Sequence, residues 1–269
     1  MTISIAQGSN KLVIDPLLGG QVLECHIGKY QIIAPKTENP LVGGWYLMAP
    51  WAGRLENNEI IYKGKNYPQE INFQNWAIHG TVAFQEGKVI NHQENFVEII
   101  HTSNKNFPVN ATIKQKWFVA NNFIRCSASI EVDEEFPVQI GWHPWFKRDL
   151  GNGKKAKYAI EAVSQYIRTK DFVTLNQTKE IGLPPFDDAF DVPSGKGFIE
   201  WPNALRLDFK FDHQTFVIYD EPEDSFCIEP QTGPPNATNH ALIVATPEKP
   251  LKAEVKWDIT AIREEKQQK

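Results

Sequence analysis

The chain has few cysteines and no long apolar segment. Cys25, Cys126 and Cys227 are the only cysteines, and their wide spacing excludes a disulfide framework or a zinc knuckle, so we expect buried free thiols. No apolar run approaches the roughly 18 residues that a membrane helix needs. The first residues lack the basic opening and apolar core of a secretion signal. We therefore expect a cytoplasmic protein with no membrane partner.

Clustered positive charge is also missing. The formal net charge is -5 at pH 7, and the lysines are thinly spread. A nucleic-acid-binding surface would gather lysine and arginine on one face. We expect no nucleic-acid partner.

The common nucleotide, nucleophile and metal motifs are missing as well. The sequence contains no GxxxxGK[ST], GxGxxG, GxSxG or HExxH pattern. Its histidines are scattered without the short paired spacing typical of metal sites, so we expect no metal.

Hydrophobic residues follow a period of two. In residues 205–212 and 251–260, apolar and polar or charged side chains alternate, which is typical of antiparallel sheet with one buried face. Strand-like runs also cover residues 96–101, 112–119, 123–132, 216–219 and 242–245, and residues 59–67 read as a hairpin turning at Gly64. The pattern predicts an all-β protein, a large antiparallel β-sandwich with few or no long helices.

Nothing in the chain resembles a linker or an internal repeat, so we expect one domain over residues 1–269. The longest loop-like stretch, residues 182–203, is rich in proline and glycine but also holds aromatic residues. We expect this stretch to be packed against the domain and to contribute to function.

Residues 141–146 place His143 between Trp142 and Trp145. If this segment is a strand, the two tryptophans point to opposite faces, so that one lines a pocket while the other packs inward. An aromatic wall suits the apolar face of a sugar ring, and an imidazole is a suitable proton donor or acceptor. A buried structural histidine is the alternative interpretation.

Five other residues carry reactive or binding side chains. Glu229 stands at the end of a buried strand, where desolvation raises the pKa of a carboxyl group toward that of a general base. His79 precedes a permissive glycine, Arg54 lies among apolar residues, and Asp187 and Asp188 form an acidic pair. The structural alternatives are an ion-paired glutamate for Glu229, a loop histidine for His79 and a solvated turn for the acidic pair.

Five segments, taken in order, resemble the aldose 1-epimerase (galactose mutarotase-like) family. They are residues 50–55, 72–80, 141–146, 186–190 and 229–235, and together they span most of the chain. The resemblance implies the family's β-supersandwich and a cofactor-independent isomerase that interconverts the α and β anomers of an aldose. It also implies a small-molecule sugar substrate, and a monomer or homodimer.

The resemblance assigns a role to each position. Glu229 is the general base for the anomeric hydroxyl, and His143 is the general acid for the ring oxygen. Binding of the sugar is assigned to a second group: His79, Arg54, Asp187 with Asp188 as the fallback, Trp142, Trp145 and Gln231. We expect a sugar-sized gap between His143 and Glu229, and a carboxylate that raises the pKa of the imidazole.

Two features depart from the family pattern. Gly53 stands where the family usually has asparagine, and the missing side chain is expected to leave room for a sugar substituent. Lys147 and Arg148 are candidates for binding a phosphate, which keeps a hexose-6-phosphate 1-epimerase open as an alternative. A non-catalytic sugar-binding or sensor protein on the same fold is the other alternative.

Overall fold

The computed structural model describes residues 1–261, which form mainly antiparallel β-sheet. Strands account for 54% of the chain and helices for 5%, and no described helix reaches seven residues. These values confirm the prediction of an all-β protein. Within residues 1–261, no helix is long and apolar enough to cross a membrane.

The larger sheet has eleven strands and carries the candidate site. Its order is β1-β2-β3-β5-β13-β21-β20-β17-β15-β16, with β4 paired to β3. The bounds are β1 Ile3–Gln7, β2 Asn10–Asp15, β3 Gln21–Ile27, β4 Tyr30–Gln31, β5 Trp45–Met48, β13 Gly141–Lys147, β15 Ser164–Arg168, β16 Thr174–Lys179, β17 Asp187–Asp191, β20 Thr215–Tyr219 and β21 Ser225–Gln231.

The second sheet has eight strands in the order β14-β18-β19-β23-β11-β10-β9-β8. Its strands are β8 Lys88–Gln93, β9 Phe96–Thr102, β10 Ala111–Val119, β11 Phe123–Val132, β14 Lys157–Ile160, β18 Lys196–Trp201, β19 Leu205–Phe211 and β23 Leu251–Ala261.

Two small sheets and four single-turn 3-10 helices complete the described fold. The small sheets pair β6 Glu59–Tyr62 with β7 Lys65–Pro68, and β12 Phe136–Pro137 with β22 Val244–Ala245. The helices are η1 Pro16–Leu18, η2 Glu56–Asn58, η3 Val82–Phe84 and η4 Ala237–His240.

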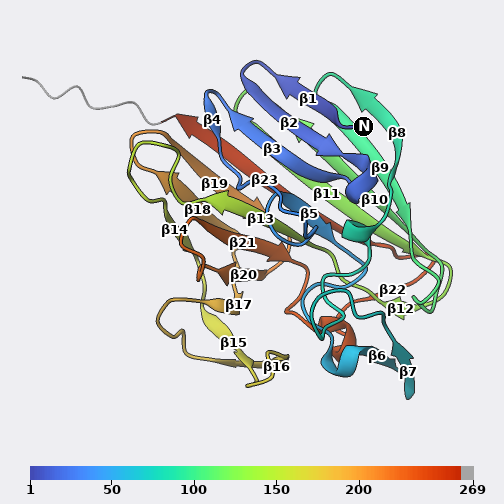
Figure 1. Ribbon diagram of the computed structural model, residues 1–269. Coiled ribbons are helices and arrows are strands. Elements are labelled where there is room, and N and C mark those ends of the chain that lie inside the picture. The colour runs from blue at the N-terminus through green and yellow to red at the C-terminus, as the bar shows by residue number, and fades with distance from the viewer. Residues whose placement is uncertain (262–269) are drawn as a thin grey trace, which may run out of the picture.

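Alternating side chains explain the arrangement of the layers. One face of each large sheet contributes to a shared hydrophobic cluster that includes Trp45, Trp117, Phe146 and Trp257. The other face of the eleven-stranded sheet carries a smaller cluster around Tyr46, Trp145 and Cys227. In Figure 1, the hairpins β6–β7 and β15–β16 extend from the same end of the sandwich. The candidate site lies on the face of the eleven-stranded sheet that carries Tyr46, Trp145 and Cys227.

The strictly alternating segments are strands, as predicted. Residues 205–212 and 251–260 form most of β19 and β23, and the hairpin of residues 59–67 turns at Lys63 and Gly64. The prediction of a long loop over residues 182–203 was wrong, because β17 and β18 lie within it. The strand predicted over residues 242–245 is reduced to β22.

Candidate active site

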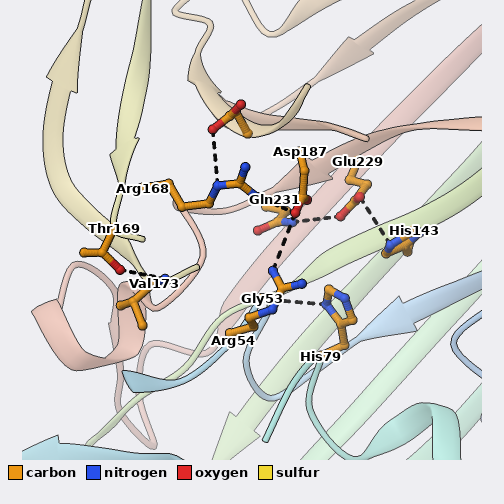
Figure 2. Close-up of polar contacts among 11 residues, drawn as sticks. Gly53, Arg54, His79, His143, Arg168, Thr169, Val173, Asp187, Glu229 and Gln231 are labelled. Carbon is orange, nitrogen blue, oxygen red and sulfur yellow. Dashed lines mark hydrogen bonds and ion pairs between the residues drawn. The ribbon is translucent and has the colours of Figure 1, made fainter. Parts of the chain in front are cut away.

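Strand register brings the predicted acid and base together. Gly141 pairs with Gln231 and Trp145 with Cys227, which places His143 opposite Glu229 across β13 and β21. Side chains two residues apart share a face, so Glu229 and Gln231 point the same way. His143 Nε2 lies 3.2 Å from Glu229 Oε1. Figure 2 marks this contact with a dashed line. The prediction of a sugar-sized gap was wrong, because directly opposed residues on paired strands are in contact.

His143 is held between two aromatic rings. Tyr46, its partner on β5, stacks on the imidazole with ring centroids 4.8 Å apart, and Trp145 stacks at 5.4 Å. Trp142 points into the core, where it is 0% exposed and meets Phe211 edge to face. The two tryptophans do face opposite ways, but Trp142 was wrongly predicted to bind sugar, since it lies on the core face of β13.

Burial sets the protonation of the acid–base pair. Burial raises the pKa of Glu229, and the nearby charge of Asp187 raises it further. Burial lowers the pKa of His143 to about 3. The expectation that Glu229 raises the pKa of His143 was wrong, because burial disfavours both charged forms. Burial therefore favours the neutral forms of both groups. The 3.2 Å contact is short enough for one proton to move between them, which would produce imidazolium and carboxylate.

Gln231 orients the Glu229 carboxyl. Gln231 Nε2 donates to Glu229 Oε2 at 3.1 Å, so Oε1 is left for His143. Gln231 is fully buried and is reached at 3.5 Å by Nε2 of Gln139, a residue that was not predicted from the sequence. Gln139 also donates to the carbonyl oxygens of Gly233 and Pro234, and thereby fixes the loop after β21.

His79 lies in the same cleft in a defined tautomer. The backbone N–H of Gly53 donates to His79 Nδ1 at 3.2 Å, so Nε2 carries the hydrogen of the neutral ring. Burial lowers the pKa of His79, and His143 and Arg54 lower it further. The rings of His79 and His143 meet edge to face at 5.1 Å. His79 is therefore a neutral hydrogen-bond donor.

Asp187 lies on the same face of the sheet as the acid–base pair, two strands away from Glu229 (Figure 2). It lies opposite Tyr219 on β20, and Tyr219 lies opposite Cys227 on β21, so all three share the cleft face. Asp187 accepts a hydrogen bond from Arg168 Nη1, and its Oδ2 is 3.8 Å from Arg54 Nη1. Burial raises the pKa of Asp187, while the two guanidinium groups lower it.

Asp188 and Arg168 extend this charged network. Arg168 Nε lies 3.5 Å from Asp188 Oδ1, so one guanidinium contacts both aspartates of the pair. Arg168 ends β15 and was missed, because nothing in the β15 sequence indicates that its hairpin folds over the cleft. Phe172, at the tip of that hairpin, has its ring centroid 5.2 Å from the Arg168 guanidinium and 5.3 Å from that of Arg54.

These residues surround a cleft of about 320 Å³, at the small end of the range for small-molecule sites. Eight of the nine predicted residues line it: Arg54, His79, His143, Trp145, Asp187, Asp188, Glu229 and Gln231. Trp142 does not. Tyr46, Arg168, Phe172, Tyr219 and Glu221 also line it and were not predicted. These residues come together through the pairing of distant strands, which the sequence alone does not reveal.

Two further expectations are corrected. Gly53 does not leave room for a substituent, because a Cβ there would lie 2.2 Å from Pro235 Cβ. Lys147 and Arg148 do not line the cleft, and Arg148 donates to the carbonyl oxygens of Asp220 and Pro222.

Comparison with known proteins agrees with this architecture. A structure of an aldose 1-epimerase homologue from Escherichia coli superposes with a TM-score of 0.84 at 15% identity, covering 97% of this chain and 99% of that one. A galactose mutarotase-like protein from Clostridium acetobutylicum gives 0.83 at 18% identity, with 97% and 95% covered. A galactose 1-epimerase from Lactobacillus acidophilus gives 0.80 at 13% identity, with 97% and 94% covered. At these identities the structures show a shared fold.

A search of curated protein sequences gives no match. The sequence model of the family described as aldose 1-epimerase matches residues 1–256, nearly the whole chain. The resemblance found in the sequence is therefore confirmed, and the chain belongs to the aldose 1-epimerase family.

Proposed function

We propose that the protein is an aldose 1-epimerase that interconverts the α and β anomers of an uncharged aldose without a cofactor. The observation that carries this proposal is the contact between His143 and Glu229 at the floor of a sugar-sized cleft. Anomeric exchange needs one acid and one base, and nothing else. Each typically contributes about 10²- to 10⁴-fold to the rate.

The short contact suits the positions of the reacting atoms. The anomeric hydroxyl and the ring oxygen are both bonded to C1, so a base and an acid that serve them must lie close together. Glu229, as carboxylate, takes the proton from the anomeric hydroxyl while His143, as imidazolium, gives a proton to the ring oxygen. The C1–O bond of the ring breaks and an aldehyde forms.

Ring closure returns both protons. After rotation about the C1–C2 bond, His143 takes the proton back from the ring hydroxyl, and Glu229 protonates the former carbonyl oxygen. The other anomer forms, and the pair regains its starting state. His79, as a neutral donor, and Asp187, as an acceptor between Arg54 and Arg168, supply hydrogen bonds that hold the sugar hydroxyls.

The charges around the cleft favour an uncharged sugar. Arg54 and Arg168 both contact Asp187, which offsets their charge. Apart from Glu229, whose charge is balanced by His143, the cleft residues include three carboxyl groups against these two guanidinium groups: Asp187, Asp188 and Glu221. A phosphorylated sugar would meet this negative charge, and Lys147 and Arg148 are not among the lining residues.

Polarimetry tests the proposal directly. Freshly dissolved α-glucose, α-galactose and their 6-phosphates are followed with and without protein. We expect faster equilibration of at least one free sugar and none of the phosphates. Equilibration at the buffer rate for every sugar, together with measurable sugar binding, would favour the sensor alternative.

The base is tested by Glu229→Gln. This change removes the proton acceptor but keeps the shape of the side chain, so we expect turnover to fall at least about 100-fold while sugar binding stays within about tenfold. Glu200→Gln is the control, because Glu200 pairs with Arg206 in the other sheet. Full turnover in Glu229→Gln would refute the assignment of the base.

A further inference from the structure

Cys227 is a buried thiol beside the acid–base pair that the proposed reaction does not use. It lies two residues before Glu229 on the same face of β21, and it is fully buried. Its ladder partners on the two sides are Trp145 and Tyr219, whose rings meet edge to face at 5.7 Å. Cys227 therefore lies between Trp145 and Tyr219 on the cleft face of the sheet.

Three possible metal ligands converge at this point. One ligand atom each from His143, Cys227 and Glu229 lie within 4.8 Å of one another. Two nitrogen or oxygen ligands on a tetrahedral zinc ion are about 3.3 Å apart, given bond lengths of about 2.0–2.1 Å. His143 Nε2 and Glu229 Oε1 are 3.2 Å apart. The sulfur must approach by about 1 Å to complete a tetrahedral face.

The chemistry of the ligands fits a zinc-class divalent cation. A thiolate, a carboxylate and a neutral imidazole balance a charge of two, which limits the cost of burying the ion. Thiolate and imidazole favour zinc and similar metals over magnesium or calcium. Gln231 holds the far oxygen of Glu229 in place, as a neighbour of a metal ligand does. Because His143 and Glu229 line the cleft, water or a sugar hydroxyl from the cleft could complete the coordination.

We propose that His143, Cys227 and Glu229 form an inhibitory site for zinc-class divalent cations. Binding forms bonds from the metal to sulfur, nitrogen and oxygen, and it releases the thiol proton and the carboxyl proton to the buffer. The bound ion occupies the atoms that would exchange protons with the sugar, so anomeric exchange stops until a chelator removes the metal. Only the inhibition rests on the proposed function; the binding does not.

Cobalt substitution reads the site without any turnover. The chelator-treated protein is titrated with Co²⁺ and followed by absorbance. We expect one equivalent to bind with a thiolate-to-cobalt charge-transfer band and the visible bands of a tetrahedral ion, and added zinc should displace it. The band should be lost in Cys227→Ala and kept in Cys25→Ala, a matched change at another buried free thiol.

Two further measurements make the outcome decisive. In Cys227→Ala, the zinc concentration that halves anomeric exchange should rise at least about tenfold, the effect of one weakened contact of about 1.4 kcal/mol. If Cys227→Ala does not fold, Glu229→Gln keeps the thiol and should keep the band while binding cobalt at least about tenfold more weakly. No thiolate band in the wild-type protein, or an unchanged band in Cys227→Ala, would overturn the proposal. A band in a protein without epimerase activity would support the metal site and reject the proposed function.

Discussion

Replacing Gly53 by alanine should destabilise the protein through one identifiable clash. Gly53 has a φ of +73°, and a Cβ there would lie 2.2 Å from Pro235 Cβ and 2.8 Å from Pro235 Cα. The left-handed conformation costs an alanine about 1–2 kcal/mol. The overlap adds about 1–3 kcal/mol, and the stiffer unfolded chain returns about 0.4–1 kcal/mol. We expect a net loss of about 1–5 kcal/mol in the free energy of unfolding.

Gly28→Ala separates the two contributions. Gly28 has a φ of +58°, but a Cβ at this position would have no neighbouring atom within 4 Å, so this change carries backbone strain without a clash. Urea unfolding followed by tryptophan fluorescence measures both variants. The Gly53 variant should be less stable than the Gly28 variant by about 1–3 kcal/mol. Equal losses in the two variants would show that Pro235 does not fill the space beside Gly53.

Three other predictions concern buried and cleft residues. Burial lowers the pKa of His101 to about 4, so below pH 6.5 the unfolded chain binds a proton that the folded protein does not bind. The free energy of unfolding should therefore fall by about 3 kcal/mol as the pH falls from 6.5 to 4. In His101→Gln, urea unfolding should show a shallower pH dependence. Arg168→Ala frees Asp187 and should raise KM about tenfold with little change in kcat, whereas Arg206→Ala, a surface control, should leave KM unchanged. Trp142→Ala should cost about 3–5 kcal/mol of stability without changing KM in the folded protein, and a change in KM would contradict its place in the core.

The sequence predicted the features that depend on local pattern. Strict alternation identified β19 and β23, because a period of two follows directly from the pleat of a strand. It also indicated that Trp142 and Trp145 point to opposite faces, but not which face is the core, since both rings are large and apolar. That choice depends on the second sheet, which packs against one side of β13.

Features that depend on pairing between distant strands could not be predicted in this way. β17 was hidden within a stretch rich in proline and glycine, so Asp187 was expected in a loop. Arg168 reaches Asp187 because β15 pairs with β17, a neighbourhood that no local pattern encodes. The direct contact between His143 and Glu229 likewise follows from the register of β13 and β21.

Because side chains alternate between the two faces of a strand, the contact between His143 and Glu229 depends on the register of β13 and β21. Inserting one residue into β21 before Glu229 would turn the carboxyl group into the core and bring an apolar neighbour to the cleft. A single insertion or deletion within β13 or β21 would therefore separate His143 from Glu229 even though both residues were kept. Arg54 lies in a loop, and Arg168 is the last residue of β15 before the turn to β16. Loops and turns tolerate insertions and deletions better than paired strands do. In the proposed epimerase, changes around Arg54 and in the β15–β16 hairpin can alter sugar preference while His143 and Glu229 stay in register.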